Sequence, residues 1–222
     1  MKTRDAQLVL GRLRQTMDGL IRQLESLDKP PAGQYRDIVA RIAVEGRAVT
    51  NVAQNLKHCF EGFEEWYGKW QEEMEGDQLC KFFYCLRTDK LKKGNDHISS
   101  LSLSNLKRGF NLSIIGGKVS YSFQSETGEH ITRVIASPEK ATGCFIDSNG
   151  IGWNILTKDG TSVKRYAEVP MHQIGIDLWF ESPPQMHRGR AIEDNSAENL
   201  CRLYVEYLGE FVRQLEARFY VT

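Results

Sequence analysis

The sequence lacks the features that mark membrane-spanning, secreted and strongly charged proteins. It has no run of about 18 apolar residues, which a helix needs to cross a bilayer, and Met1 is followed by charged residues instead of an apolar signal core. Its 29 basic and 29 acidic side chains cancel, so no net charge attracts the chain to nucleic acid or to anionic lipid. These absences predict a cytoplasmic protein without a membrane partner.

Metal-binding patterns are missing as well. No two histidines lie three to five residues apart, so the sequence offers neither a zinc-finger pair nor a metalloprotease pair. The number of cysteines is odd, and Cys80 and Cys85 would lie about 140° apart around a helix axis. The neighbours of the cysteines are mostly aromatic or aliphatic, which favours reduced, buried thiols. We therefore expect no metal and no other cofactor.

Helical periodicity is abundant near both ends of the chain. Leucines and Met17 recur every three or four residues from Leu10 to Leu27, which predicts an amphipathic helix that packs within a bundle. The segment 29–33, with two adjacent prolines, ends this helix. A last helix, from about residue 195, carries a broad stripe of leucine, tyrosine and phenylalanine. Because this stripe needs a wide apolar partner, we expect it to return to the N-terminal helices.

Further helices are expected between these two. The periodicity from residue 34 to residue 74 predicts one very long helix or two stacked helices. A kink or break is expected near Gly62 or Gly68, because glycine weakens a helix interior. Asp77 is a suitable cap for a new helix, and lysines followed by Gly94 end that helix.

The middle of the chain changes to two-residue alternation with frequent turn residues. From about residue 98 to residue 181 this pattern predicts six or seven short strands in an antiparallel sheet, with a hairpin turn at Gly116-Gly117. The sequence therefore predicts an α+β fold. Residues 1–96 and 194–222 would form a helical bundle, and residues 97–193 would form an antiparallel β insertion.

One stretch combines aromatic and charged residues more densely than any other. After Trp66 and Trp70, residues 82–94 read Phe-Phe-x-x-Leu-Arg-x-x-x-Leu-Lys-x-Gly. This order resembles a group of uncharacterised bacterial proteins, which are similar to the HEPN helical bundles of prokaryotic defence and toxin systems. The resemblance covers residues 60–94 well, the last helix loosely and the predicted sheet not at all. It implies a helical bundle that forms a dimer.

The sequence departs from the HEPN pattern at one position. HEPN ribonucleases carry an arginine and, after four to six residues, a histidine. Counted from Arg87, the corresponding positions hold Lys92, Lys93 and Gly94, and His97 lies beyond the expected helix end. Lysine, with an ordinary pKa of about 10.4, is a poor general base at neutral pH, whereas histidine, at about 6.5, is suited to proton transfer. We therefore expect binding without cleavage.

Six residues are candidates for binding an anion or nucleic acid. Cations at the end of the predicted helix would contact phosphates, and nearby indoles would stack on bases. The alternative is structural, because cations complement the dipole at a helix C-terminus and tryptophans four residues apart often lie in a core. The six candidates are Arg87, Lys90, Lys92, Lys93, Trp66 and Trp70.

The expected function is that of a non-catalytic binding protein. We expect it to form a homodimer, because four helices of unequal length would not cover all of their own apolar surface when they pack together. Nucleic acid or another protein is a possible partner. One alternative is a ribonuclease or nucleotide-modifying enzyme that uses Arg87 and Asp89 with a substituted base. Another is a small-ligand-binding module on the sheet, near Trp153 and Trp179.

Other polar residues of the sheet region form no recognisable catalytic motif. The residue types include those of a catalytic nucleophile, base and orienting group. No nucleophile elbow, phosphate loop or dinucleotide fingerprint accompanies them. Met186-His187 is similarly isolated and carries no expected role. The residues of this hypothetical catalytic set are His130, Cys144, Asp147, His172 and Asp177.

Overall fold

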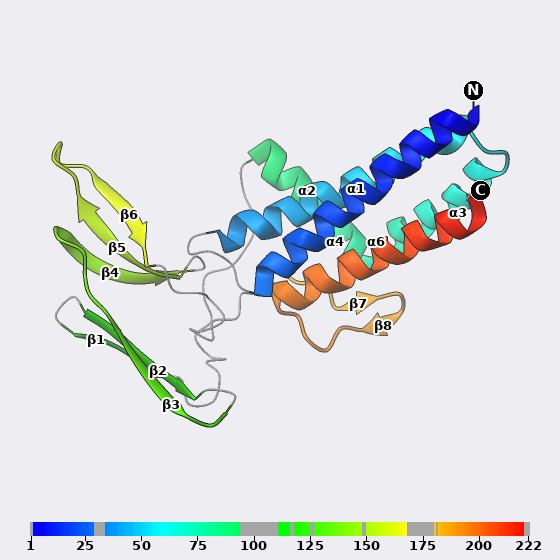
Figure 1. Ribbon diagram of the computed structural model, residues 1–222. Coiled ribbons are helices and arrows are strands. Elements are labelled where there is room, and N and C mark those ends of the chain that lie inside the picture. Colours follow the sequence, from blue (N-terminus) through cyan, green and yellow to red (C-terminus); the bar gives the residue numbers. More distant parts are fainter. Residues whose placement is uncertain are drawn as a thin grey trace. The chain divides into compact units, whose positions relative to one another are not determined.

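The computed structural model describes residues 2–28, 34–93, 111–115, 118–124, 127–147, 150–167, 180 and 182–219. The chain divides into two units. A helical unit draws on Met1–Leu27, Ile38–His97 and Phe180–Thr222, and a β unit draws on Asp28–Asp37 and Ile98–Trp179. In Figure 1 the helices from the two ends of the chain lie together. The prediction of an α+β fold with inserted antiparallel strands is confirmed.

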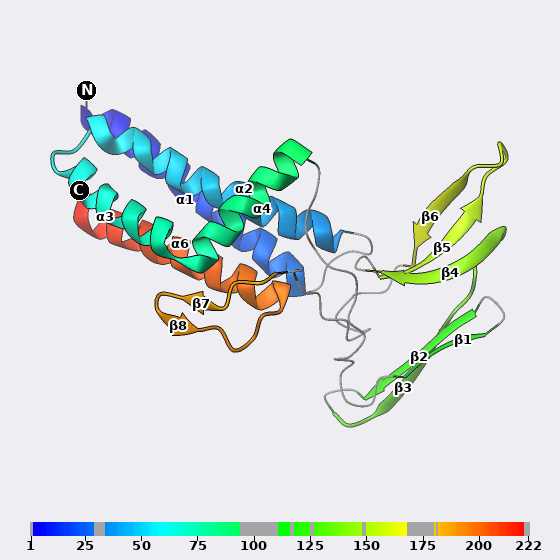
Figure 2. The same cartoon turned by 180° about the vertical axis from the view of Figure 1, so that it is seen from behind.

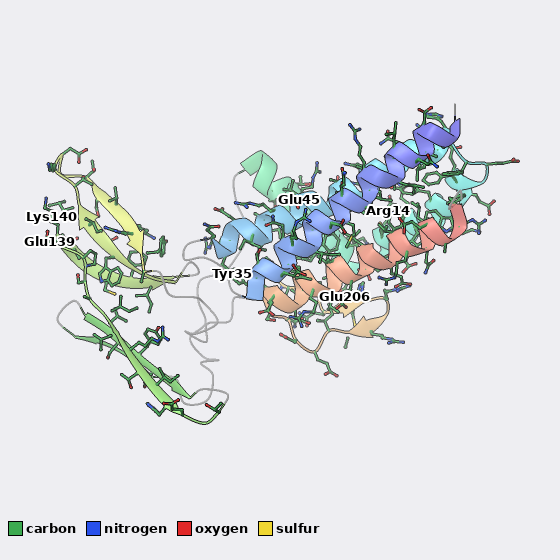
Figure 3. All side chains as sticks on the ribbon, in the orientation of Figure 1. Arg14, Tyr35, Glu45, Glu139, Lys140 and Glu206 are labelled. Atoms are coloured by element: carbon green, nitrogen blue, oxygen red, sulfur yellow. The ribbon has the colours of Figure 1, made fainter. Side chains whose placement is uncertain are left out.

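The helical unit contains α1 (Lys2–Asp28), α2 (Tyr35–Gln54), α3 (Phe63–Gly76), α4 (Gln78–Lys93) and α6 (Ala197–Phe219). The predicted stripe of α1 is buried at Leu10, Leu13, Met17 and Leu20. Arg14 of α1, which Figure 3 labels, forms an ion pair with Glu216 of α6 (Nε to Oε1, 2.6 Å). The first and last helices are therefore neighbours, as the apolar stripe of the last helix predicts.

The long periodic segment breaks between α2 and α3. Helix α2 is followed by a 3-10 turn, η1 (Asn55–His58). Gly62, which has a φ of 72°, directly precedes the first residue of α3. Glycine adopts this left-handed conformation without a steric penalty. Gly68, the other candidate for the break, lies inside α3. The predicted stops at residues 29–33 and at Gly94 lie outside the described residues.

Aromatic side chains join α3 to α6. Trp66 stacks on Phe211, with ring centroids 5.5 Å apart, and Trp70 meets the same ring edge-on at 5.3 Å. Trp70 also contacts Tyr207 at 5.4 Å. Offset and edge-on pairs of this kind stabilise a core beyond their buried area. The two tryptophans proposed as binding candidates therefore pack against α6, which is the structural alternative raised by their spacing.

In its described residues, the β unit forms two three-stranded antiparallel sheets. The first has the order β1 (Asn111–Ile115), β2 (Lys118–Gln124), β3 (His130–Ile135), and the second has the order β4 (Ala141–Asp147), β5 (Gly150–Leu156), β6 (Ser162–Tyr166). Each middle strand buries one face, through Val119 and Tyr121 in β2 and through Ile151 and Trp153 in β5. The predicted Gly116-Gly117 turn lies outside the described residues, although the strands that flank it pair with each other.

A small hairpin belongs to the helical unit rather than to the β unit. Its strands β7 (Met186–His187) and β8 (Arg190–Ala191) pair antiparallel, and both views show it beside α6 (Figures 1 and 2). Arg188 and Gly189 form its two-residue turn, with φ values of 48° and 73°. Two successive positive φ values are typical of the primed turns that suit a hairpin.

Candidate functional site

Asp77 occupies the corner between α3 and α4, and its carboxylate holds three parts of the chain together. Oδ1 accepts the Cys80 backbone N–H at 3.0 Å, so Asp77 caps the first turn of α4 as its position in the sequence predicts. Oδ2 accepts the backbone N–H of Arg188 at 2.7 Å. Nδ1 of His187 lies 3.1 Å from the same oxygen. The carboxylate therefore fastens the β7–β8 hairpin to the start of α4.

Arg188 brings a second set of ionic contacts to this corner. Its Nε lies 3.0 Å from Oε1 of Glu73 on α3, and its Nη1 lies 2.5 Å from Oε2 of Glu210 on α6. Its guanidinium also lies over the ring of Tyr207, 5.4 Å from the centroid. We call Asp77, His187, Arg188, Glu73 and Glu210 the Asp77 cluster. Each charged group in this cluster has a partner of opposite charge or a hydrogen bond.

The pKa shifts in the Asp77 cluster indicate a structural role and not a catalytic one. Burial alone would raise the pKa of Asp77, but hydrogen bonds from His187, Arg188 and Cys80 outweigh it and lower the pKa to about 2. Burial raises the pKa of the Cys80 thiol and of the Tyr207 hydroxyl. An activated thiol nucleophile needs a lowered pKa, so Cys80 is unsuited to that role.

A pocket of about 540 Å³ lies among α2, α3, α4 and α6. Cys80 lines this pocket and also donates its backbone N–H to Asp77. We call it the bundle pocket. Half of its lining is buried and forms its floor; the remainder is half-buried or exposed and forms its mouth. The floor comprises Thr50, Tyr67, Cys80, Phe83, Tyr204 and Leu208, and the mouth comprises Arg47, Gln71, Met74, Glu75, Lys81 and Tyr84.

The floor of the bundle pocket depends on one close approach. The rings of Tyr204 and Phe83 stack with centroids 4.2 Å apart and planes 4° apart. A Cβ at Gly46 would lie 2.4 Å from Cε1 of Tyr204, so only glycine lets α2 come this close to the ring. The Tyr67 hydroxyl is also fixed, because it accepts a hydrogen bond from Gln54 Nε2 at 3.0 Å and donates to the Thr50 carbonyl at 3.4 Å.

Arg47 is the half-buried cation at the mouth of the bundle pocket. Its Nη1 donates to Oγ1 of Thr50 at 3.0 Å, and within the described part of the chain no carboxylate pairs with it. A guanidinium has five N–H donors, so most of these donors remain available. Burial raises the pKa of Tyr204 and keeps its hydroxyl neutral, while the positive charges of Arg47 and Arg87 act in the opposite direction. Both arginines therefore lie within electrostatic reach of the pocket floor.

The structure separates the residues that the sequence grouped as binding candidates. Arg87 is half-buried on α4 but does not line the bundle pocket, and neither do Trp66 and Trp70. The side chains of Lys90, Lys92 and Lys93 lie outside the described residues. None of the contacts of His187 joins it to Arg87. His187 and Arg47 were not candidates, and no local sequence signal points to either residue.

The polar set of the sheet region is described only in part. His130 is exposed on β3, and Cys144 is half-buried on β4, where burial raises its pKa. Trp153 is buried in β5. His172, Asp177 and Trp179, together with the side chain of Asp147, lie outside the described residues, as does His97. The structure therefore brings no complete catalytic set together in the part of the β unit that it describes.

The described residues carry few other features that indicate a function. Among the described residues, no group of three or more histidine, cysteine, aspartate or glutamate side chains is arranged to hold a metal ion. In the same part of the chain, no helix is long and apolar enough to span a bilayer. No protein-family model, no curated protein and no solved structure matches this chain. The geometry of the two neighbouring sites is therefore the basis for any functional assignment.

Proposed function

We propose that this protein is a non-catalytic binding protein that takes up a small molecule in the bundle pocket. The observation that carries the proposal is the combination, in one pocket, of an aromatic floor, an arginine without a carboxylate partner, and reactive groups that burial keeps neutral. Ligand pockets typically have volumes of about 300 to 1,000 Å³ and a mainly apolar lining with a few polar groups. The bundle pocket fits this description.

The absence of activated groups supports binding rather than turnover. A cysteine or tyrosine that reacts must ionise near neutral pH, and the raised pKa values of Cys80 and Tyr204 oppose ionisation. The histidine of the neighbouring corner, His187, is held by Asp77 and does not line the pocket. A bound molecule would therefore meet side chains that hold it but do not attack it.

Two parts of the expected function remain predictions of the sequence. These are the likeness to HEPN helical bundles, which rests on the residue pattern of 82–94, and the homodimer, which that likeness implies. Light scattering that returns a single 25.4 kDa species at micromolar concentration would exclude the dimer. Incubation with single-stranded RNA, alongside the variant Arg87→Ala, would detect a ribonuclease, because cleavage that disappears in the variant would contradict a purely binding role.

The direct test is a screen of aromatic fragments by saturation-transfer NMR. Met74→Trp enlarges a half-buried side chain at the mouth of the bundle pocket, whereas Glu72→Trp adds the same group to an exposed position of α3 outside it. We expect fragments that bind the wild type and Glu72→Trp but not Met74→Trp, and that are recovered unchanged. A screen without pocket binders, or chemical conversion of a binder, would overturn the proposal.

A further inference from the structure

We infer that the bundle pocket is selective for aromatic anions, in which a flat ring system carries a carboxylate or a phosphate. This inference rests on the proposed function and names its ligand class. The anionic group would bind at Arg47, and the ring would bind against the aromatic residues of α4 and α6. Neither the fold nor any similarity to a known protein supplies this assignment, which comes from the charges and rings that line the pocket.

The charge balance at the mouth of the pocket favours an anion. Arg47 has only the Thr50 hydroxyl as a partner among the described residues, whereas Arg188 of the Asp77 cluster is paired with two carboxylates. The single acidic residue of the lining, Glu75, already accepts a hydrogen bond from Gln71 Nε2 at 3.2 Å. Lys81 adds a second cation. A cationic ligand would meet repulsion from two sides, and a neutral ligand would leave the guanidinium unmatched.

Thr50 prepares Arg47 for this role. Its hydroxyl accepts from the guanidinium at 3.0 Å and donates to the Arg47 carbonyl at 3.0 Å, so it restrains the side chain before a ligand arrives. Thr50 is itself buried, with 3% of its surface exposed. A restrained guanidinium loses less conformational freedom when it binds, and its planar fork matches a carboxylate or a phosphate. Thr50 is therefore a positioning residue for the anion.

Aromatic side chains line the bundle pocket at both its floor and its mouth. Tyr204 and Phe83 stack at the floor, and the neighbouring Tyr84 is 56% exposed at the mouth. Met74 and Leu208 add apolar lining. Tyr84 and the half-buried Met74 both line the mouth, so a flat ring that enters the pocket meets one aromatic and one apolar side chain there. Rings bind such surfaces by offset stacking or by edge contacts.

Two matched pairs of probes test the inference. 2-Naphthoate and naphthalene-2-carboxamide share a ring system and differ in the charge of the attached group, and AMP and adenosine provide the same contrast with a phosphate. Dissociation constants would be measured by calorimetry for the wild type, Arg47→Gln and Arg41→Gln. Arg41 is an exposed arginine on the same helix that does not line the pocket. Met74→Trp reports whether binding occurs in the pocket.

We expect at least one of the anions to bind in the pocket, and Arg47→Gln to weaken its binding by about 10- to 100-fold, as for the loss of a charge-assisted hydrogen bond. The matched neutral probe should change by less than about twofold, and Arg41→Gln should change neither probe. The preferred pair identifies the carboxylate or the phosphate. Pocket binding that is insensitive to Arg47→Gln would overturn the inference and leave the proposed function standing. Binding by no probe, or binding that survives Met74→Trp, would also overturn the inference, and the outcome of the fragment screen would then decide the proposed function separately.

Discussion

The Asp77 cluster and the bundle pocket both take side chains from α3 and α6, but their charged groups differ in how they are paired. In the cluster, Asp77 and Arg188 are each held by several partners from other elements. In the pocket, Arg47 has a single neutral partner among the described residues. A buried charge with matched partners serves the fold, and a cation without one is available to a ligand. Substitutions in the two sites should therefore separate stability from binding.

The largest expected effect is on stability, at Asp77. Asp77→Ala removes the cap of α4 and leaves the His187 ring and the Arg188 backbone N–H without the carboxylate that they contact. We expect the free energy of unfolding to fall by about 3 to 5 kcal/mol, as when one partner of a buried ionic network is removed. Urea unfolding monitored by circular dichroism measures this loss. Asp18→Ala, an exposed position on α1, is the control, and equal losses at both positions would contradict the role of the cluster.

The pH dependence of stability should identify the same carboxylate. The pKa of Asp77 is lowered from its ordinary 3.8 to about 2 in the folded state. Its contribution is therefore complete above pH 3.8 and disappears as the pH falls through about 2, with a total of about 2 kcal/mol. Unfolding measured from pH 5 to pH 2 should show a steeper decline for the wild type than for Asp77→Asn. Parallel curves would assign the acid sensitivity to other carboxylates.

Gly46→Ala tests the close approach that forms the floor of the pocket. The added methyl group would lie 2.4 Å from Cε1 of Tyr204, so the helices must separate or the ring must move. We expect a loss of about 1 to 3 kcal/mol, which is typical of overpacking. Gly11→Ala is the matched control on α1, where no atom lies within 4 Å of the added group. That control should stabilise the protein by up to about 1 kcal/mol, through helix propensity.

The smallest effects on stability should distinguish the two arginines. Arg188→Gln breaks two ion pairs that are partly exposed, and we expect it to cost about 1 kcal/mol. Arg47→Gln breaks no ion pair among the described residues and should change stability by less than about 0.5 kcal/mol. Thermal unfolding of both variants side by side measures the difference. A large loss for Arg47→Gln would make Arg47 a structural residue and would remove the contrast between the sites.

Patterns that are local in the sequence predicted much of the helical unit. The apolar stripe of α1, the break at Gly62 and the capping role of Asp77 each depend on residues within a few turns of one another. The α+β division follows from the change of period in the middle of the chain. The arrangement of the strands as two three-stranded sheets and a separate hairpin, instead of one sheet, depends on pairing choices that alternation alone does not specify.

The candidate site could not be predicted because it is assembled from distant segments. His187 meets Asp77 across 110 positions of the chain, through a hairpin whose two-residue strands are too short to produce a periodic signal. The bundle pocket takes its lining from four helices, and its buried aromatic residues Tyr67, Phe83 and Tyr204 follow the same spacing as ordinary core residues. The position of Arg47 in the periodicity of α2 is one that solvent-exposed arginines on amphipathic helices also occupy. Only its lack of a carboxylate partner in the described structure distinguishes it.

The separation between Asp77 and His187 also constrains how the chain is made. A ribosome that has just added Asp77 must add 110 more residues before His187 exists, which takes roughly 5 to 20 seconds at ordinary rates of synthesis. During that interval the aromatic faces of α3 and α4 have no α6 to cover them. Until its last helix emerges from the ribosome, the nascent polypeptide therefore exposes aromatic side chains that the finished fold buries.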